Sequence, residues 1–122
     1  MIYPFTFYTD RRLKDWQAGA TFGPVILIRP KYREDVGLLE HEKMHVKQWW
    51  FTLGLHALLY WLSKRYRLWA EAKAYAEQMR WPDRFGNRLS LQGAASRLAL
   101  PEYGFGITPE QAQTVLEKLN GQ

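Results

Sequence analysis

The sequence predicts an α+β fold in which a small N-terminal sheet, antiparallel or mixed, packs on one long helix that further helices follow. Two observations support this. Residues with strong strand preference, β-branched and aromatic, are concentrated before Ile28. After that point, apolar residues recur every three or four positions, which is the spacing of one helix face. A chain of 122 residues suits one hydrophobic core, so we expect residues 1–122 to form a single domain.

The expected sheet comes from two segments near the N-terminus. Residues 2–9 are rich in aromatic and β-branched side chains and predict a strand, with Pro4 at its start or on a sheet edge. Residues 10–20 are polar and predict a connection or a short helix. Residues 25–28 are apolar, mostly β-branched and flanked by prolines, which predicts a buried strand.

A long helix is expected from about residue 34 to residue 52. Glu34 and Asp35 place negative charge at its N-terminus, where the helix dipole favours it, and Gly54 interrupts the pattern. Its expected inward stripe repeats at steps of seven, four and three residues. The members of this stripe are Leu39, Val46, Trp50 and Leu53.

Four further helices are expected towards the C-terminus. Residues 55–63 form a strongly apolar segment, and residues 64–81 form a helix that ends before a proline. After a turn, residues 89–100 predict a short helix. Thr108 supplies an N-cap, followed by a proline at the first helical position, for a last helix that ends at Leu119. We expect this C-terminal third to serve packing, because it carries no recognisable chemistry.

The segment His41-Glu42-Lys43-Met44-His45 carries most of the chemical information in the chain. Histidines four apart on a helix lie on one face, so both imidazoles can reach one metal ion. Glu42 is turned by about 100° beside them, which brings its carboxylate within reach of a water molecule at the metal. The alternative interpretation is a helix with two surface histidines and a solvated glutamate.

Glu71 is the candidate third ligand. A carboxylate inside an apolar stripe is unfavourable unless it is paired or bound to a metal ion. Its partner is therefore either an Arg or Lys side chain or a metal, and zinc is the better candidate beside the two motif histidines. The apolar stripe that surrounds it consists of Leu68, Ala72, Tyr75 and Met79.

Two other polar residues lie close to the motif. Gln48, three residues after His45, is on the histidine side of the helix and could form a hydrogen bond near the site. His56 would be about 16 Å from His45 along a continuous helix. It reaches the site only if the chain folds back at Gly54, so a core or surface histidine is expected there.

Composition narrows the possible partners. There is no cysteine, so any metal must be held by His, Asp or Glu. The chain has 17 basic and 12 acidic residues without a basic run, which gives little support to a nucleic-acid partner. The N-terminus lacks the pattern of a signal peptide, and the longest apolar run, residues 51–62, is too short to span a bilayer. We expect a cytoplasmic protein without a membrane partner; the oligomeric state is open.

The motif and the segment Glu71-Ala72-Lys73-Ala74-Tyr75, which begins 26 positions after His45, together resemble the gluzincin class of zinc metallopeptidases. The resemblance covers roughly residues 23–78. Within this class, the chain looks most like the small bacterial and phage members. It implies a zincin-like fold and a peptide or protein substrate that pairs along the strand 25–28 as a sheet edge. The chain lacks the second subdomain of larger members. The implied site has His41, His45 and Glu71 as ligands to Zn²⁺ and Glu42 as catalytic base.

The implied reaction is hydrolysis of a peptide bond, with Glu42 taking a proton from water and delivering it to the leaving nitrogen. Tyr75 shares a helix face with Glu71, so it either offers its hydroxyl to the oxyanion or is a core tyrosine bonded elsewhere. A second hypothesis keeps the metal without turnover, as a zinc-stabilised structural or interaction module. Glu42 favours the peptidase, because a purely structural site needs no base at that position.

Overall fold

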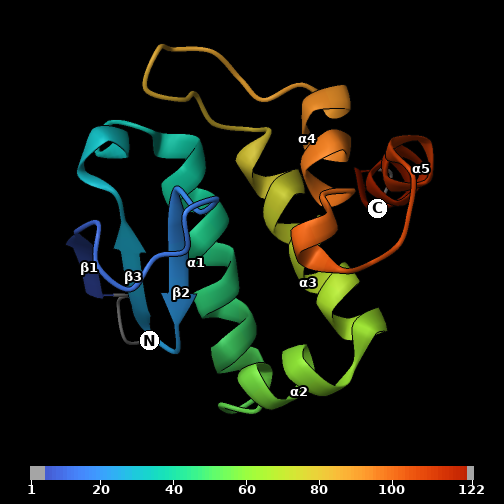
Figure 1. Cartoon of the computed structure of the whole chain (residues 1–122), viewed down its shortest axis with the longest axis horizontal. Helices are drawn as coiled ribbons and strands as arrows, with labels where there is room; N and C mark the ends of the chain where they lie inside the picture. Colours follow the sequence, from blue (N-terminus) through green and yellow to red (C-terminus); the bar gives the residue numbers. More distant parts are fainter. Residues whose placement is uncertain (1–4, 121–122) are drawn as a thin grey trace.

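The computed structural model describes residues 5–120, and these form an α+β fold with a small mixed sheet, as predicted. The sheet lies on one side of helix α1, helix α3 lies on the other side, and α4 and α5 follow beyond α3 (Figure 1). Single 3-10 turns lie at Pro30–Tyr32 and Pro101–Tyr103. The strands and helices are β1 (Phe5–Tyr8), β2 (Gly19–Phe22), β3 (Val25–Ile28), α1 (Val36–Phe51), α2 (His56–Leu62), α3 (Lys64–Gln78), α4 (Leu91–Leu98) and α5 (Pro109–Asn120).

The three strands have the order β1-β3-β2, with β1 parallel and β2 antiparallel to β3. The prediction of a sheet edge at residues 25–28 was therefore wrong, because β3 is the central strand. Residues 10–18 form the predicted connection, but the prediction was wrong for Gly19 and Ala20, which belong to β2. The cause is a tight hairpin: Phe22 pairs with Val25 across Gly23, whose φ of +61° suits glycine. Residues 2–4, part of the predicted first strand, lie outside the described residues.

A first apolar core lies between the sheet and α1. Ile26 and Ile28 of β3 are buried against Leu38 and Val46 of α1, and Leu39 and Trp50 pack against the same cluster. Three members of the predicted stripe are therefore placed correctly, and the fourth is not. Leu53 lies beyond the end of α1, has a φ of +54° and is 90% exposed, because the chain turns back at Gly54.

Helix α1 begins with a side-chain cap. The Asp35 carboxylate accepts a hydrogen bond from the Leu38 backbone N–H at 2.8 Å, which satisfies one of the free donors at the helix start. From there α1 runs antiparallel to α3 (Figure 1). The two helices approach closely at Gly37, where an added Cβ would lie 3.2 Å from the Gln78 side chain. A small residue at this position therefore lets α1 and α3 pack closely.

A second apolar core joins α3 to the C-terminal helices. Ala72 and Tyr75 are buried in it, and Leu68 and Met79 pack against it, so the predicted stripe of α3 is confirmed. The predicted cap of α5 is also present: Thr108 accepts from the backbone N–H of Gln111, whose side chain accepts in return from the Thr108 N–H. The remaining buried members are Ala94, Ala95, Leu98, Phe105, Ala112 and Leu116.

Helix α2 differs from the others because it buries none of its residues, although its sequence is strongly apolar. It connects the end of α1 to the start of α3 and lies at one end of the molecule (Figure 1). Within residues 5–120, no helix has both the length and the apolar character needed to cross a membrane.

Candidate metal centre

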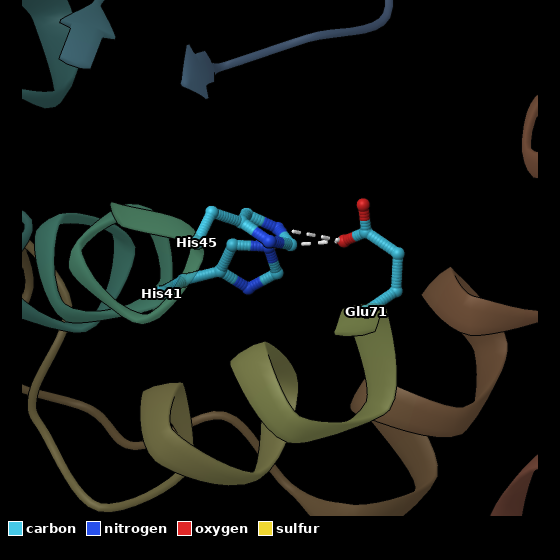
Figure 2. A group of neighbouring side chains, drawn as sticks. All are labelled: His41, His45 and Glu71. Carbon is cyan, nitrogen blue, oxygen red and sulfur yellow. Dashed lines mark hydrogen bonds and ion pairs between the residues drawn. The ribbon is translucent and has the colours of Figure 1, made fainter. Parts of the chain in front are cut away.

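His41 and His45 project from α1 towards Glu71 on α3 (Figure 2). Nε2 of His45 lies 3.1 Å and Nε2 of His41 3.4 Å from the same carboxylate oxygen, Glu71 Oε1. All three side chains are buried, and their possible ligand atoms lie within 4.8 Å of one another. The structure thus brings together the three residues that the sequence suggested as ligands, and the group could hold a metal ion.

Gln48 determines which nitrogen of His45 faces the site. The Gln48 amide nitrogen donates to the backbone carbonyl of Ala70 at 3.0 Å, so its amide oxygen is the atom that meets His45 Nδ1 at 2.9 Å. That oxygen can only accept, so Nδ1 of His45 carries a hydrogen. Nε2 is then the nitrogen that faces Glu71, where it can carry a proton or, once deprotonated, bind a metal ion. The sequence prediction of a hydrogen bond from Gln48 near the site is confirmed.

Two imidazole nitrogens converge on one carboxylate oxygen, and each contact requires a proton or a metal ion between the two atoms. Lone pairs at these separations repel unless a proton or a metal ion lies among them. Burial alone would lower the pKa of His45 and raise that of Glu71, but each is outweighed by the other group: the carboxylate raises the pKa of His45, and the histidines lower the pKa of Glu71. Within residues 5–120 no Arg or Lys pairs with Glu71.

Tyr60 fixes the other oxygen of Glu71. Its hydroxyl donates to Glu71 Oε2 at 2.5 Å, which leaves Oε1 to face the histidines. Burial, together with the nearby carboxylate, raises the pKa of Tyr60, so the hydroxyl remains a donor at neutral pH. Two imidazoles and one carboxylate oxygen match the ligand set of zinc sites with three protein ligands and one open position. The residues present therefore fit a metal ion.

Apart from the contact of its Nε2 with Glu71, His41 is positioned by packing. Its Nδ1 is buried and has no partner within residues 5–120, whereas its ring packs edge-on against Tyr75 with centroids 4.4 Å apart. The Tyr75 hydroxyl lies 2.6 Å from that of Tyr103. Burial raises the pKa of both phenols, which keeps them protonated. Tyr103 belongs to the C-terminal third, so that segment contributes to the site as well as to packing.

Glu42, the residue expected to act as base, is also buried but does not belong to the ligand group. Thr21 of strand β2 donates from its hydroxyl to Glu42 Oε1 at 2.7 Å and contacts the Glu42 backbone oxygen at 3.2 Å. The edge strand therefore holds this carboxylate in place. Thr21 was not identified from the sequence, because the strand that carries it was missed.

His56 lies beside the metal group and outside it. The chain does fold back after Gly54, which brings the His56 ring to 5.8 Å from the His45 ring. Its Nδ1 is hydrogen-bonded to the Tyr66 hydroxyl at 2.7 Å. Burial and the nearby His45 lower the pKa of His56 to about 4, so its imidazole is neutral at physiological pH.

The metal group opens into a cleft of about 930 Å³. One wall is strand β2, another is the inner side of α2, and the floor is the face of α1 that carries His41, Glu42 and His45. Tyr75 and Tyr103 line the side formed by α3 and the C-terminal segment. A cleft of this size beside buried polar groups is typical of a ligand-binding site.

Comparisons with protein-family models, with curated proteins and with solved structures find no match for this chain. What the site can do chemically is therefore derived from its own side chains. These provide three convergent ligand atoms, a separate buried carboxylate and two protonated phenols around one cleft.

Replacing Tyr60 with phenylalanine is expected to weaken zinc binding about tenfold or more, because Glu71 Oε2 loses the donor that orients the carboxylate. Competition with a chromophoric chelator measures this affinity. Tyr66→Phe is the matched control, since Tyr66 bonds to His56 and not to Glu71. Wild-type affinity in Tyr60→Phe would show that this hydrogen bond does not support the site.

The stability of the metal-free protein and the extra stability given by added metal should change with pH in opposite directions. In chelator-treated protein the raised pKa of His45 stabilises the fold fully below its ordinary value of 6.5, and the lowered pKa of Glu71 does so above 4.5. Thermal unfolding should therefore show greatest stability in this window, declining at higher pH as His45 loses its proton.

A metal ion held by the group would replace that proton, so the stabilisation by added zinc, used as the probe metal, should grow as pH rises through neutrality. Glu71→Gln is the control, because it removes the charge that holds the proton. A zinc effect that does not change with pH would contradict the competition between zinc and the proton.

Proposed function

We propose that the chain is a zinc-dependent peptidase of zincin-like architecture. His41, His45 and Glu71 hold Zn²⁺ in this proposal, and Glu42 is the general base. The observation that carries this proposal is the position of Glu42. Its carboxylate is buried beside the three candidate ligands and lines the same cleft, but Glu42 is not one of the ligands. A buried carboxylate is unfavourable without a cationic partner, and residues 5–120 provide none for Glu42. A catalytic role is the best explanation for a glutamate at this position.

The choice of zinc follows from the donor set. Imidazole nitrogen with a single carboxylate oxygen suits zinc, whereas magnesium and calcium prefer sites made of oxygen alone. Three protein ligands at an open cleft are typical of catalytic zinc, while structural sites are closed by four. This difference favours the peptidase over a catalytically silent zinc-stabilised module.

The roles of the chain's own residues follow from their contacts. A bound zinc ion would supply Lewis acidity, polarising a substrate carbonyl and acidifying water. Thr21 donates to Oε1 of Glu42, which leaves Oε2 to accept the proton of the attacking water and to pass it to the leaving amide nitrogen. The water-excluding burial of Glu42 strengthens this transfer because the local dielectric is low.

The tyrosine pair can stabilise the developing oxyanion. Two hydroxyls 2.6 Å apart share one hydrogen bond, so one of the two O–H groups remains available to a substrate. Both Tyr75 and Tyr103 line the cleft. The role suggested for Tyr75 from its position on α3 therefore extends to the pair, with either phenol as the donor.

The substrate in this proposal is a peptide in extended conformation. Strand β2 is an edge strand, and all four of its residues line the cleft. A peptide can add to such an edge through backbone hydrogen bonds. Strand β2 thus takes the role that the sequence had suggested for residues 25–28. A cytoplasmic location and the absence of a nucleic-acid partner stay predictions.

Glu42→Gln is expected to keep the fold and the zinc while hydrolysis of an unstructured protein falls at least about a hundredfold, the scale of a lost general base. Zinc content and initial rates of cleavage measure the two effects separately. Glu40→Gln is the matched control, because Glu40 is a carboxylate on the same helix that bonds to Lys43 instead. Full activity in zinc-loaded Glu42→Gln would assign the base to another residue.

The module hypothesis makes the opposite prediction for the wild type. Zinc-loaded protein that cleaves nothing across a broad peptide library would replace the peptidase with a zinc-stabilised structural or interaction domain.

A further inference from the structure

Large apolar side chains are exposed to solvent at the end of α1 and along α2. Each is more than half exposed; Leu53 reaches 90% and Trp61 reaches 77%. Because α2 buries none of its residues, this surface lies at the end of the molecule, away from both apolar cores (Figure 1). We name it the apolar tip, and it consists of Phe51, Leu53, Leu55, Leu58, Trp61 and Leu62.

The apolar tip is not explained by folding. Contiguous exposed apolar surface is rare on soluble monomers and marks a binding surface. Leu53 adds a second unfavourable feature, since its φ of +54° is uncommon for a residue with a side chain. An exposed leucine in a strained conformation is retained at binding and switch segments, where the strain has a use.

The chain segment that carries the apolar tip has charges of one sign. Between Glu42 and Glu71 the sequence contains no acidic residue. Lys47 near the end of α1 is exposed, and so are Lys64 and Arg65 at the start of α3, so exposed basic residues precede and follow the tip along the chain. The other basic residues of this segment are Lys43 and Arg67.

We propose that the apolar tip binds the surface of a bilayer rich in anionic phospholipid. Apolar side chains with a Trp enter the boundary between headgroups and acyl chains, while Lys47, Lys64 and Arg65 contact the lipid phosphates. A second copy of the chain is a poorer occupant, because two basic rims would meet face to face. The sequence expectation of no membrane partner rested on the lack of a spanning segment, and surface binding needs none.

The binding surface and the metal centre share α2. Tyr60, which holds Glu71, and His56, which packs beside His45, lie on the side of α2 that faces the site. Ala57, Tyr60 and Trp61 also line the cleft. Lipid binding would therefore place one wall of the cleft at the membrane. The proposal does not depend on peptidase activity, since it concerns the exposed apolar side chains of the tip and not the metal group.

Sedimentation with vesicles tests the proposal on the full chain. Binding is expected to vesicles of phosphatidylglycerol and phosphatidylcholine, to weaken as salt rises above about 0.1 M, and to be nearly absent with phosphatidylcholine alone. The triple variant Phe51→Ser, Leu53→Asn, Leu62→Ser should bind about a hundredfold more weakly. These side chains are exposed, so the variant should melt like the wild type. Phe85→Ser, an exposed aromatic in a distant turn, is the apolar control and should bind normally.

A charge variant tests the basic rim. Replacing Lys47, Lys64 and Arg65 with glutamine should also weaken binding on the order of a hundredfold, at roughly fivefold for each charge. The matched control removes the same charge elsewhere, with glutamine at Arg80, Arg88 and Lys118, and should change affinity far less.

Three results would overturn the proposal. The first is no binding to phosphatidylglycerol vesicles at about 0.1 M salt, and the second is equal binding by the wild type and the apolar triple variant. The third is a concentration-dependent dimer in sedimentation velocity that the apolar variant abolishes while vesicles are not bound. That result would assign the apolar tip to self-association.

Discussion

The structure depends on the buried carboxylate of Glu71. A charged oxygen removed from water must face a cation or a set of donors, and here it faces two imidazole nitrogens and one phenol. The packing around it explains why water does not provide this compensation. An apolar core lies on the sheet side of α1 and a second one on the far side of α3, so the polar contact between these helices is enclosed by both. Occupation of the group by metal or proton is therefore linked to how α1 and α3 pack.

Three residues next to the candidate ligands fix the orientation of the side chains at the site. Gln48 selects the tautomer of His45, Tyr60 directs one oxygen of Glu71, and Thr21 holds Glu42 apart from the ligands. These contacts come from separate elements, α1, α2 and β2, that meet only in the folded chain. Helix α2 is the least buried of them, so a surface event at α2 is the most direct way to influence Glu71 through Tyr60.

The grouping of His41, His45 and Glu71 could be predicted because helical spacing alone places two histidines on one face and Glu71 inside an apolar stripe. Strand β3 was found for a similar local reason, as a short apolar run between prolines. Strand β2 was missed, since Gly19 and Ala20 have weak strand preference and the pairing of the strand comes from the hairpin at Gly23. The supporting residues Tyr60 and Tyr103 could not be found either, because their roles depend on how the chain folds back. Hydrophobic periodicity relates residues a few positions apart, whereas these contacts join residues that are more distant in the sequence.

X-ray absorption at the zinc edge, on protein loaded with one zinc per chain, tests the central claim most directly. The structure predicts two imidazoles and light oxygen ligands at about 2.0 to 2.2 Å, with the spectrum unchanged in His56→Ala and tight binding lost in Glu71→Ala. Three imidazoles in the wild-type spectrum, or tight binding that survives Glu71→Ala and disappears in His56→Ala, would contradict the assignment of Glu71 as the third ligand.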